Sequence, residues 1–484
     1  MADSDPITLL WFRQDLRISD NPALVRAAET GNLLPIYILD DINAADWAMG
    51  GASRVWLHHS LAALNESLNN RMQFFVGDAR QILDHLTDSL PIQAIHWNRC
   101  YEPWRISRDR LIKQDLRDKG LAVKSYNGSL LFEPWTIKKK DGEPYRVFTP
   151  FFRNAYSRLL PRTPARCPHI DFYQHPIEFA KTLKDLHLLP QHSWGKTVMS
   201  HWQAGERAAQ ARLNDFLDSN LNDYAKARDY PAEDGTSRLS PYLHFGEISP
   251  DQICYRLQQP AGLNGDETGF AFIRQLIWRE FSHHLLYQFP QLPDTNFQSR
   301  FNHMETSENQ DDLEKWQSGN TGFPIIDAGM RELRQTGYMH NRIRMLVASF
   351  LTKNLGQSWR AGARWFWDNL VEADLANNSA GWQWCAGSGA DAAPYFRVFN
   401  PLLQSEKFDK QGAYLLRYCP ELGNLPFQSI HQPWYRVDRS QEESITSAEI
   451  GYPKPMIDLK ASREAALARY KTLGSNEIRP PGFL

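Results

Sequence analysis

Five short apolar runs, separated by stretches with helical spacing, recur in the first third of this chain. The runs cover residues 7–12, 33–39, 74–76, 94–97 and 121–123. Short buried strands that alternate with helices are typical of a parallel, doubly wound sheet. We therefore predict an α/β fold that begins with a Rossmann-like domain over residues 1–132.

Two helix signals lie between these runs. Asp20 and Asn21 form a polar cap in front of Pro22, a residue suited to the first helical turn. A second stretch, residues 53–68, has apolar residues at helical spacing. Both stretches therefore fit the helices that connect neighbouring parallel strands.

The rest of the chain changes character twice. Residues 133–200 contain eight prolines, so we expect a long connector that wraps over the surface without regular structure. From residue 201 the pattern is helical, and strand signals are nearly absent. We predict a large all-α domain over residues 201–484, with helices at 205–224, 270–287, 327–336, 341–355 and 361–370.

Composition narrows the class of protein. No run approaches the roughly 18–20 apolar residues that a membrane span needs. The start, MADSDPITLLWF, lacks the basic and apolar regions of a signal peptide. Five scattered cysteines without CxxC spacing fit a reducing compartment. We therefore expect a cytoplasmic protein.

Charge and missing motifs exclude several functions. A net charge of −2 does not indicate a strongly basic nucleic-acid binder, although it leaves room for a local basic patch. The first domain lacks the GxGxxG and GxxxxGK[ST] phosphate loops, and GxSxG and HExxH are absent from the chain. The adjacent pairs His58-His59 and His283-His284 diverge on a helix, so we expect no metal site.

Three stretches of the helical domain stand out. Residues 235–246 place hydroxyl groups and one arginine before a helix signal, which indicates either a capped turn or a phosphate site. Gln275 and Trp278 share a helical face, either in the core or at a site. Residues 374–384 bring a carboxylate, amides and two indoles together, which suggests a pocket for a planar ligand with polar edges, or a buried turn.

Together these motifs resemble the DNA photolyase/cryptochrome family. The resemblance rests on Trp11-Phe12-Arg13-Gln14-Asp15-Leu16-Arg17 and on residues 20–24, 235–240, 278–281, 321–328, 339–342 and 374–384, which follow in the family's order. It extends from residue 7 to about residue 470, and it is strongest to bacterial class I cyclobutane pyrimidine dimer photolyases.

The resemblance implies an antenna domain followed by a helical domain that binds FAD non-covalently. Asn378 would face N5 of the flavin, and Arg344 would form an ion pair with Asp374 beside the ring. The residues expected to contact FAD are Tyr224, Thr236, Ser237, Arg238, Leu239, Ser240, Arg279, Asn341, Arg344, Asp374 and Asn378.

The implied reaction is light-driven repair of UV-damaged DNA, single- or double-stranded, by a monomer. Reduced FAD would pass an electron to a flipped-out pyrimidine dimer, which Trp278 and Trp384 would hold by stacking. The residues expected at the dimer or the DNA strand are Arg228, Gln275, Trp278, Arg279, Asn341, Arg342, Met345, Trp384, Gln404 and Lys407.

Two departures from the family pattern leave alternatives open. Gln275 stands where dimer-repairing members usually carry Glu, which keeps a non-repairing cryptochrome or a (6-4) photolyase in view; Asn341 and Met345 disfavour the latter. Trp382 and Trp359 match the inner two residues of the tryptophan chain that reduces the flavin. Thr306 stands near the place of the third, so the route ends at Trp359 or leaves by another aromatic such as Trp316.

The antenna chromophore is also open at this point. Residues 97–103 suit a pocket in the first domain, and Arg105 replaces the Glu that a folate-binding relative would carry. Arg105 disfavours a folate without excluding it, and a deazaflavin, another flavin or an empty site also stay open.

Overall fold

A five-stranded parallel sheet forms the first domain of the computed structural model, which describes residues 6–160, 162–257, 267–434 and 451–473. The strand order is β3-β2-β1-β4-β5. Each of the five apolar runs overlaps a strand, which confirms the predicted fold class. The strands are β1 (Ile7–Phe12), β2 (Leu33–Leu39), β3 (Gln73–Val76), β4 (Ile92–Asn98) and β5 (Ala122–Tyr126).

Helices cover both faces of the sheet, so alternate residues of β1 enter different cores. Leu10 and Phe12 pack in one hydrophobic cluster, while Leu9 and Trp11 pack in another. The predicted cap is confirmed, because Asn21 Oδ1 accepts a hydrogen bond from the Leu24 amide at 3.0 Å. The helices of this domain are α1 (Pro22–Ala28), α2 (Gly51–Ser67), α3 (Ala79–Ser89) and α4 (Pro103–Asp118), with a 3₁₀ turn at Ala45–Trp47.

The connector contains more regular structure than its prolines suggest. It forms α5 (Phe148–Ser157) and α6 (Trp194–Met199). Pro150 does not interrupt α5, because it falls in the first turn of the helix, where its missing N–H costs nothing. The connector also returns to the sheet: the Leu33 amide donates to Asp171 O at 2.7 Å, and the Lys181 amide donates to Phe74 O at 2.8 Å. It is therefore held against β2 and β3 by backbone hydrogen bonds.

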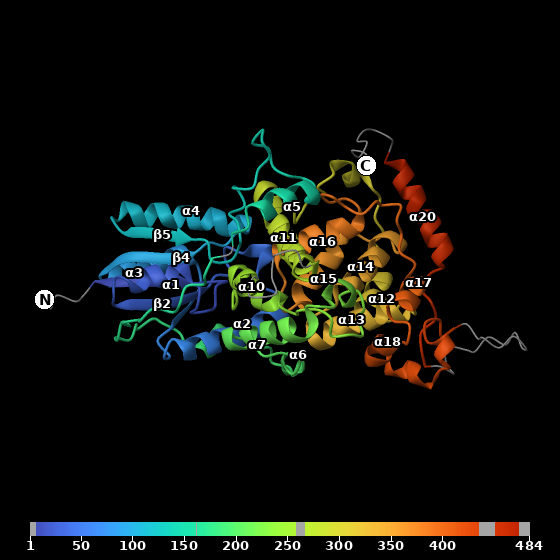
Figure 1. Cartoon of the computed structure of the whole chain (residues 1–484), viewed down its shortest axis with the longest axis horizontal. Helices are drawn as coiled ribbons and strands as arrows, with labels where there is room; N and C mark the ends of the chain where they lie inside the picture. Colours follow the sequence, from blue (N-terminus) through green and yellow to red (C-terminus); the bar gives the residue numbers. More distant parts are fainter. Residues whose placement is uncertain (1–5, 161, 258–266, 435–450, 474–484) are drawn as a thin grey trace, which may run out of the picture.

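The remainder is helical and lies beside the sheet domain (Figure 1). Two predicted helices differ from the structure, because regular α-helix ends at Asp215 and at Ser349 and continues as single π-helical turns. The elements are α7 (Glu206–Asp215), π turn Phe216–Asn220, α8 (Tyr224–Ala227), α9 (Ser240–His244), α10 (Pro250–Leu257), α11 (Glu267–Gln288), α12 (Gln310–Ser318), α13 (Pro324–Thr336), α14 (Asn341–Ser349), π turn Phe350–Asn354, α15 (Trp359–Asn369), α16 (Leu375–Ala386), α17 (Pro401–Phe408), α18 (Ala413–Tyr418) and α20 (Leu459–Thr472).

Short 3₁₀ turns complete the described chain, at Leu183–Leu186, Ser299–His303, Pro420–Asn424 and Phe427–Ser429. Within the described ranges, none of the helices combines the length and the apolar character needed to cross a bilayer.

The two domains meet where the start of α2 packs against the end of α15. The Gly51 amide donates to Asp368 Oδ1 at 2.8 Å, and the Ser53 hydroxyl donates to Leu370 O at 2.8 Å. A Cβ on Gly50 would lie 2.2 Å from the Trp367 carbonyl oxygen, so only glycine allows this approach. The contact fixes the sheet domain against the wall of the helical domain.

A buried carboxyl, Glu247, lies at the same interface. Its oxygens accept hydrogen bonds from the Gly205 amide at 2.6 Å and from Trp56 Nε1 at 3.1 Å, and the residue is fully buried. Burial raises the pKa of Glu247 to about 8, although these hydrogen bonds lower it. The folded protein therefore holds a proton that the unfolded chain loses near pH 4.5.

We expect this proton to make stability fall as pH rises. Because the pKa of Glu247 is higher in the folded than in the unfolded protein, its full contribution to the free energy of unfolding is present below about pH 4.5. This contribution falls progressively between about pH 4.5 and pH 8. Between pH 5.5 and pH 8 the free energy of unfolding should fall by about 3 kcal/mol. Urea unfolding at both pH values measures it, and Glu247→Gln should flatten the slope. An unchanged slope in the variant would contradict the assignment.

Candidate functional site

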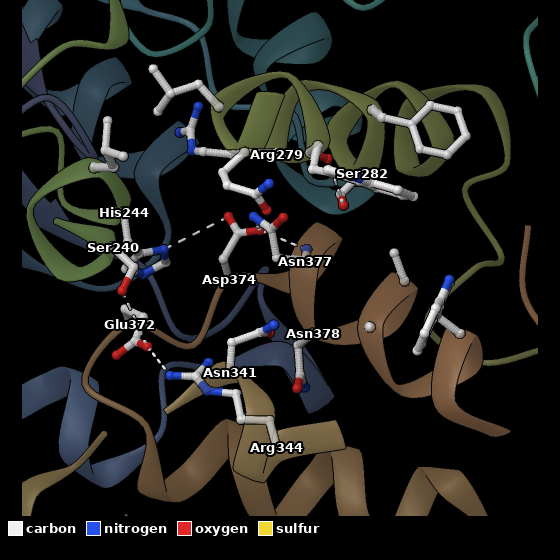
Figure 2. A pocket seen from close by; sticks show the side chains of 18 of the residues that line it. Ser240, His244, Arg279, Ser282, Asn341, Arg344, Glu372, Asp374, Asn377 and Asn378 are labelled. Atoms are coloured by element: carbon white, nitrogen blue, oxygen red, sulfur yellow. Dashed lines mark hydrogen bonds and ion pairs between the residues drawn. The ribbon is translucent and has the colours of Figure 1, made fainter. Parts of the chain in front are cut away.

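A cavity of about 600 Å³ opens in the helical domain between α11, α14 and α16 (Figure 2). Its size is that of a site for a cofactor or a small ligand. Most of the predicted site residues come together here, from segments more than 150 residues apart. They are Tyr224, Arg228, Ser237, Leu239, Ser240, Gln275, Trp278, Arg279, Asn341, Arg344, Met345, Asp374, Asn378, Trp382 and Trp384.

Other predicted residues lie outside the lining. Arg238 forms an ion pair with Asp234 at 3.2 Å, and the Thr236 carbonyl accepts a hydrogen bond from Arg212 at 3.2 Å. Arg342 pairs with Asp229, and its guanidinium lies 4.3 Å from the ring centre of Phe408. Lys407 lies 5.1 Å from the same ring, and Gln404 shares helix α17 with it. Arg342 and Lys407 thus lie together beside Phe408, outside the cavity.

The start of α16 orients the polar groups on one side of the cavity. Asp374 caps the helix by accepting the Asn377 amide at 2.8 Å, as expected of an Asp at this position. One turn along, Asn378 Nδ2 donates to Ala363 O at 2.9 Å. This bond uses the amide N–H of Asn378 within the protein, so its carbonyl oxygen is the side that can accept a hydrogen bond from a ligand.

The predicted ion pair between Arg344 and Asp374 is wrong. Arg344 instead binds Glu372, which is 5% exposed, and Glu372 also accepts from the Ser240 hydroxyl at 3.5 Å (Figure 2). The Arg344 Nε donates to Met339 O at 2.6 Å. These contacts hold the guanidinium near the start of α14. There Arg344 pairs with Glu372 and not with Asp374.

Asp374 lies between two histidines. Its Oδ2 is 3.4 Å from His283 Nε2 and 3.7 Å from His244 Nδ1. Burial alone would lower the pKa of His283, but the Asp374 carboxylate outweighs burial and raises it. Burial alone would raise the pKa of Asp374, but the two histidines hold it well below its usual range. The cluster therefore favours a carboxylate beside a protonated His283.

The residues predicted to contact the pyrimidine dimer also line this cavity. Trp278 stacks on Phe148 with ring centres 3.6 Å apart and planes 9° apart, which fixes one face of the indole. Gln275 Oε1 accepts from Arg228 Nη2 at 3.1 Å, which leaves the amide N–H₂ as its free donor. Asn341 Nδ2 lies 3.9 Å from Met345 Sδ on the same face of α14.

Of the two predicted electron-carrying tryptophans, Trp382 belongs to α16 and Trp359 is the first residue of α15. Trp382 lines the cavity and packs edge-on against Phe366 at 5.0 Å and Trp316 at 6.1 Å. Trp316 is completely buried, and its Nε1 donates to Val347 O at 3.1 Å. Trp359 borders a second cavity, where the exposed Thr306 also lies. Trp316 therefore provides no exit to solvent.

The carboxyl edge of the sheet holds only a small cavity of about 50 Å³. Buried ion pairs fill the surrounding space: Arg108 binds Asp40 at 3.1 Å, and Arg13 binds Asp109 at 2.5 Å. Arg105 lines this cavity and lies 3.5 Å from Glu102.

The sequence did not single out Glu372 and His244 of the main cavity, or His283, which contacts Asp374 from outside the lining. Glu372 lies two positions before Asp374, so spacing alone does not show which carboxylate faces Arg344. The adjacent pair His283-His284 indicated only the absence of a metal site, and His244 appeared only within residues 235–246. In the described ranges, no three His, Cys, Asp or Glu side chains are grouped as metal ligands.

Comparison with known proteins agrees with this architecture. Residues 8–169 match a family model described as DNA photolyase, and residues 272–472 match one described as the FAD binding domain of DNA photolyase. A deoxyribodipyrimidine photo-lyase of Agrobacterium fabrum is 42% identical over 467 residues, which cover 96% of this chain and 97% of that protein.

Two further matches carry names other than deoxyribodipyrimidine photo-lyase. Cryptochrome-2 of Arabidopsis thaliana is 34% identical and covers 99% of this chain, with 84% of its own length matched. The crystal structure of a bacterial class III photolyase from Agrobacterium tumefaciens superposes with a TM-score of 0.91 at 41% identity, covering 98% of each chain. This match is to class III, whereas the motifs pointed to class I.

Proposed function

The chain belongs to the DNA photolyase/cryptochrome family, with an FAD-binding domain, and from this premise we propose that it repairs cyclobutane pyrimidine dimers in UV-damaged DNA under light. The observation that carries the proposal is the main cavity. It combines a wall of polar groups suited to FAD with two partly exposed indoles, Trp278 and Trp384, suited to stacking on the two linked pyrimidines of a dimer.

FAD fits the polar wall. Glu372 Oε2 is buried without a partner, and the Asn378 carbonyl oxygen is free to accept a hydrogen bond, so a ligand with N–H and O–H groups would satisfy both. When bound, FAD supplies the light-driven electron that opens the dimer. Tyr224, Ser237, Ser240, Arg344, Asp374 and Asn378 would hold it, and Asn378 would accept from the flavin N–H.

The protein's own task is then to bind and place the dimer. The damaged pair must leave the duplex stack, at a cost of a few kcal/mol that its weakened pairing reduces. Trp278 presents a fixed ring face because Phe148 supports it from behind. Arg342 and Lys407 lie outside the cavity, where contacts to phosphates would be independent of sequence.

The direct test uses an oligonucleotide with one thymine dimer, purified protein whose flavin is chemically reduced, blue light and a dark control. We expect light-dependent recovery of intact thymines. No recovery with reduced FAD bound would reject the proposal and favour a signalling cryptochrome, which the match to Cryptochrome-2 and the presence of Gln275 support. Repair of a (6-4) photoproduct in the same assay would identify the other alternative.

Trp384→Ala should weaken binding of dimer-containing DNA. Stacking of a base on an aromatic side chain contributes about 1–3 kcal/mol, so the Kd should rise about 5- to 150-fold. Trp135→Ala is the matched control, because Trp135 is exposed and lies outside the cavity. Fluorescence anisotropy measures both. Equal losses in the two variants, or equal losses with undamaged DNA, would contradict a role for Trp384 at the dimer.

Gln275→Glu should accelerate repair of the dimer. A carboxylate beside Arg228 gives a charge-assisted contact about twice as strong as the amide's, which we expect to raise the repair rate about fivefold. Single-turnover repair with pre-reduced protein measures the rate. Gln291→Glu, at an exposed residue outside the cavity, adds the same charge and should give no acceleration. An unchanged rate in Gln275→Glu would mean that the amide is already compensated.

For the antenna, the cavity at the sheet edge, lined by Trp11, Tyr37 and Arg105, is the candidate site for a deazaflavin or another flavin. A folate-type chromophore bound elsewhere on the domain stays compatible with this arrangement. The five unpaired cysteines support a reducing compartment, the cytoplasm, as the place where the protein acts.

A further inference from the structure

A second cavity, of about 410 Å³, lies on the far side of α16 from the main site. Cys385 lines the main cavity, and the next residue, Ala386, lines the second. Its walls come from residues 295–306, residues 352–360, the segment after α16 and Arg469 of α20. Several of these residues, including Thr295 and Thr306, are exposed, so the cavity opens to solvent.

Two buried hydroxyl groups in this cavity have no hydrogen-bond partner. They belong to Ser388, which is 1% exposed, and to Tyr395, which is 3% exposed. The Tyr395 hydroxyl lies near the Arg469 guanidinium without forming a well-aligned hydrogen bond. Unsatisfied buried hydroxyls are rare and costly, so they indicate a missing polar partner.

The charge of the lining is positive. Arg360 and Arg469 contribute cations, and Glu305, at the exposed rim, is the carboxylate among the lining residues. Arg469 donates one N–H to Lys353 O at 2.7 Å, which leaves other guanidinium N–H groups for a ligand. Lys353 lies behind, with its Nζ 5.5 Å from the ring centre of Tyr395. The cavity therefore favours a small anion that carries hydroxyl groups.

Trp359 forms part of the wall. It is 5% exposed, and its Nε1 donates to Asn296 Oδ1 at 2.8 Å. Asn296 is a neutral acceptor that takes no proton, so an oxidised Trp359 would keep its N–H. Trp359 precedes Gly362 by one turn of α15, and Gly362 packs directly on the Trp382 ring. No ring contact joins Trp359 to another aromatic residue in the described ranges.

We propose that this cavity binds a small anionic reductant of the enediol class, which restores an electron to oxidised Trp359. The proposal rests on the proposed function, because light must first draw an electron from Trp359 through Trp382. The enediol monoanion loses one electron and one hydroxyl proton to become a radical anion. Trp359 gains the electron and becomes neutral, and the proton passes to solvent. No covalent bond to the protein forms or breaks.

Arg469 would bind the enolate oxygen, and the hydroxyls of Ser388 and Tyr395 would pair with those of the reductant. Arg469 is thus a binding residue, and Trp359 is the group that reacts. Thr306 lines the cavity and is exposed, so it lies where the cavity meets solvent.

The first experiment measures binding in the dark, by calorimetric titration of ascorbate into the FAD-loaded protein. We expect one site, weakened about tenfold by Arg469→Gln because a charged hydrogen bond is lost. Arg463→Gln is the matched control, since Arg463 is on the exposed side of the same helix, outside the cavity. No binding, or equal binding by wild type and Arg469→Gln, would overturn the proposal.

The second experiment measures flavin photoreduction against ascorbate concentration. The rate should saturate at the concentration that half-fills the site in the dark titration, and Arg469→Gln should shift that concentration by the same factor. Neutral dithiothreitol should show no saturation. A linear dependence on ascorbate in the wild type would contradict the proposal. Because neither experiment uses DNA, failure of dimer repair would leave these results interpretable on their own.

Discussion

Replacing Trp382 with Phe should slow photoreduction of the bound flavin about a hundredfold, which corresponds to about 2.7 kcal/mol in barrier height. Trp382 is the indole that lines the main cavity on the side of α15, and Gly362 packs against its ring. Phe fills most of the space but is far harder to oxidise. Absorbance of the oxidised flavin under blue light with a reductant present measures the effect.

Two comparisons make this result specific. Trp316→Phe is the matched control, because Trp316 touches Trp382 at 6.1 Å but is completely buried and reaches no solvent. It should photoreduce at close to the wild-type rate. With chemically reduced flavin, Trp382→Phe should repair dimers normally, since the dimer receives its electron from the flavin. Wild-type photoreduction in Trp382→Phe would show that the electron takes another route.

Replacing Glu372 with Gln should destabilise the FAD-loaded protein by about 3 kcal/mol, the lower end of the range for breaking a buried ion pair. Glu372 is almost fully buried, and Arg344 is about one quarter exposed, so part of the loss is screened. Gln keeps the shape but leaves the Arg344 charge without a partner. Urea unfolding of the holoprotein measures the loss, and faster release of FAD on dilution should accompany it.

Asp229→Asn provides the matched comparison for this pair. Asp229 binds Arg342 in an ion pair whose carboxylate is 42% exposed, so its removal should cost less than about 1 kcal/mol. If Glu372→Gln is no more destabilising than Asp229→Asn, then Arg344 is compensated by other groups, and the Tyr338 ring, 5.1 Å from its guanidinium, is the nearest candidate.

The sheet was predictable because its signal is local. Each buried parallel strand appears as a short apolar run, and β1 and β2 match their runs to the residue. β5 extends three residues beyond its run, because Lys124, Ser125 and Tyr126 lie on an edge strand where polar and half-buried side chains are tolerated. The π turn after Asp215 was not predictable, since apolar spacing continues through it.

The sequence predicted which residues line the site, but not which of their side chains contact one another. Motif order brought Gln275, Trp278, Asn341 and Asn378 into one cavity from helices far apart in the chain. The partner of Arg344 depends on how the loop before α16 turns, and no spacing rule distinguishes Glu372 from Asp374. Of the second cavity only Trp359 and Thr306 were singled out from the sequence, and nothing indicated a cavity there, because its walls come from four separate segments.

The connector's hydrogen bonds to the sheet have a consequence for aggregation. β3 is the outermost strand on its side, and its Val76 is half exposed, so its free backbone groups could pair with another molecule. The bond from Lys181 to Phe74 occupies part of that edge. A fragment ending at residue 132 would keep all five strands yet lose this cover, and it would expose a template for intermolecular β-pairing. The connector thus also limits self-association, because it occupies part of the exposed edge of the sheet.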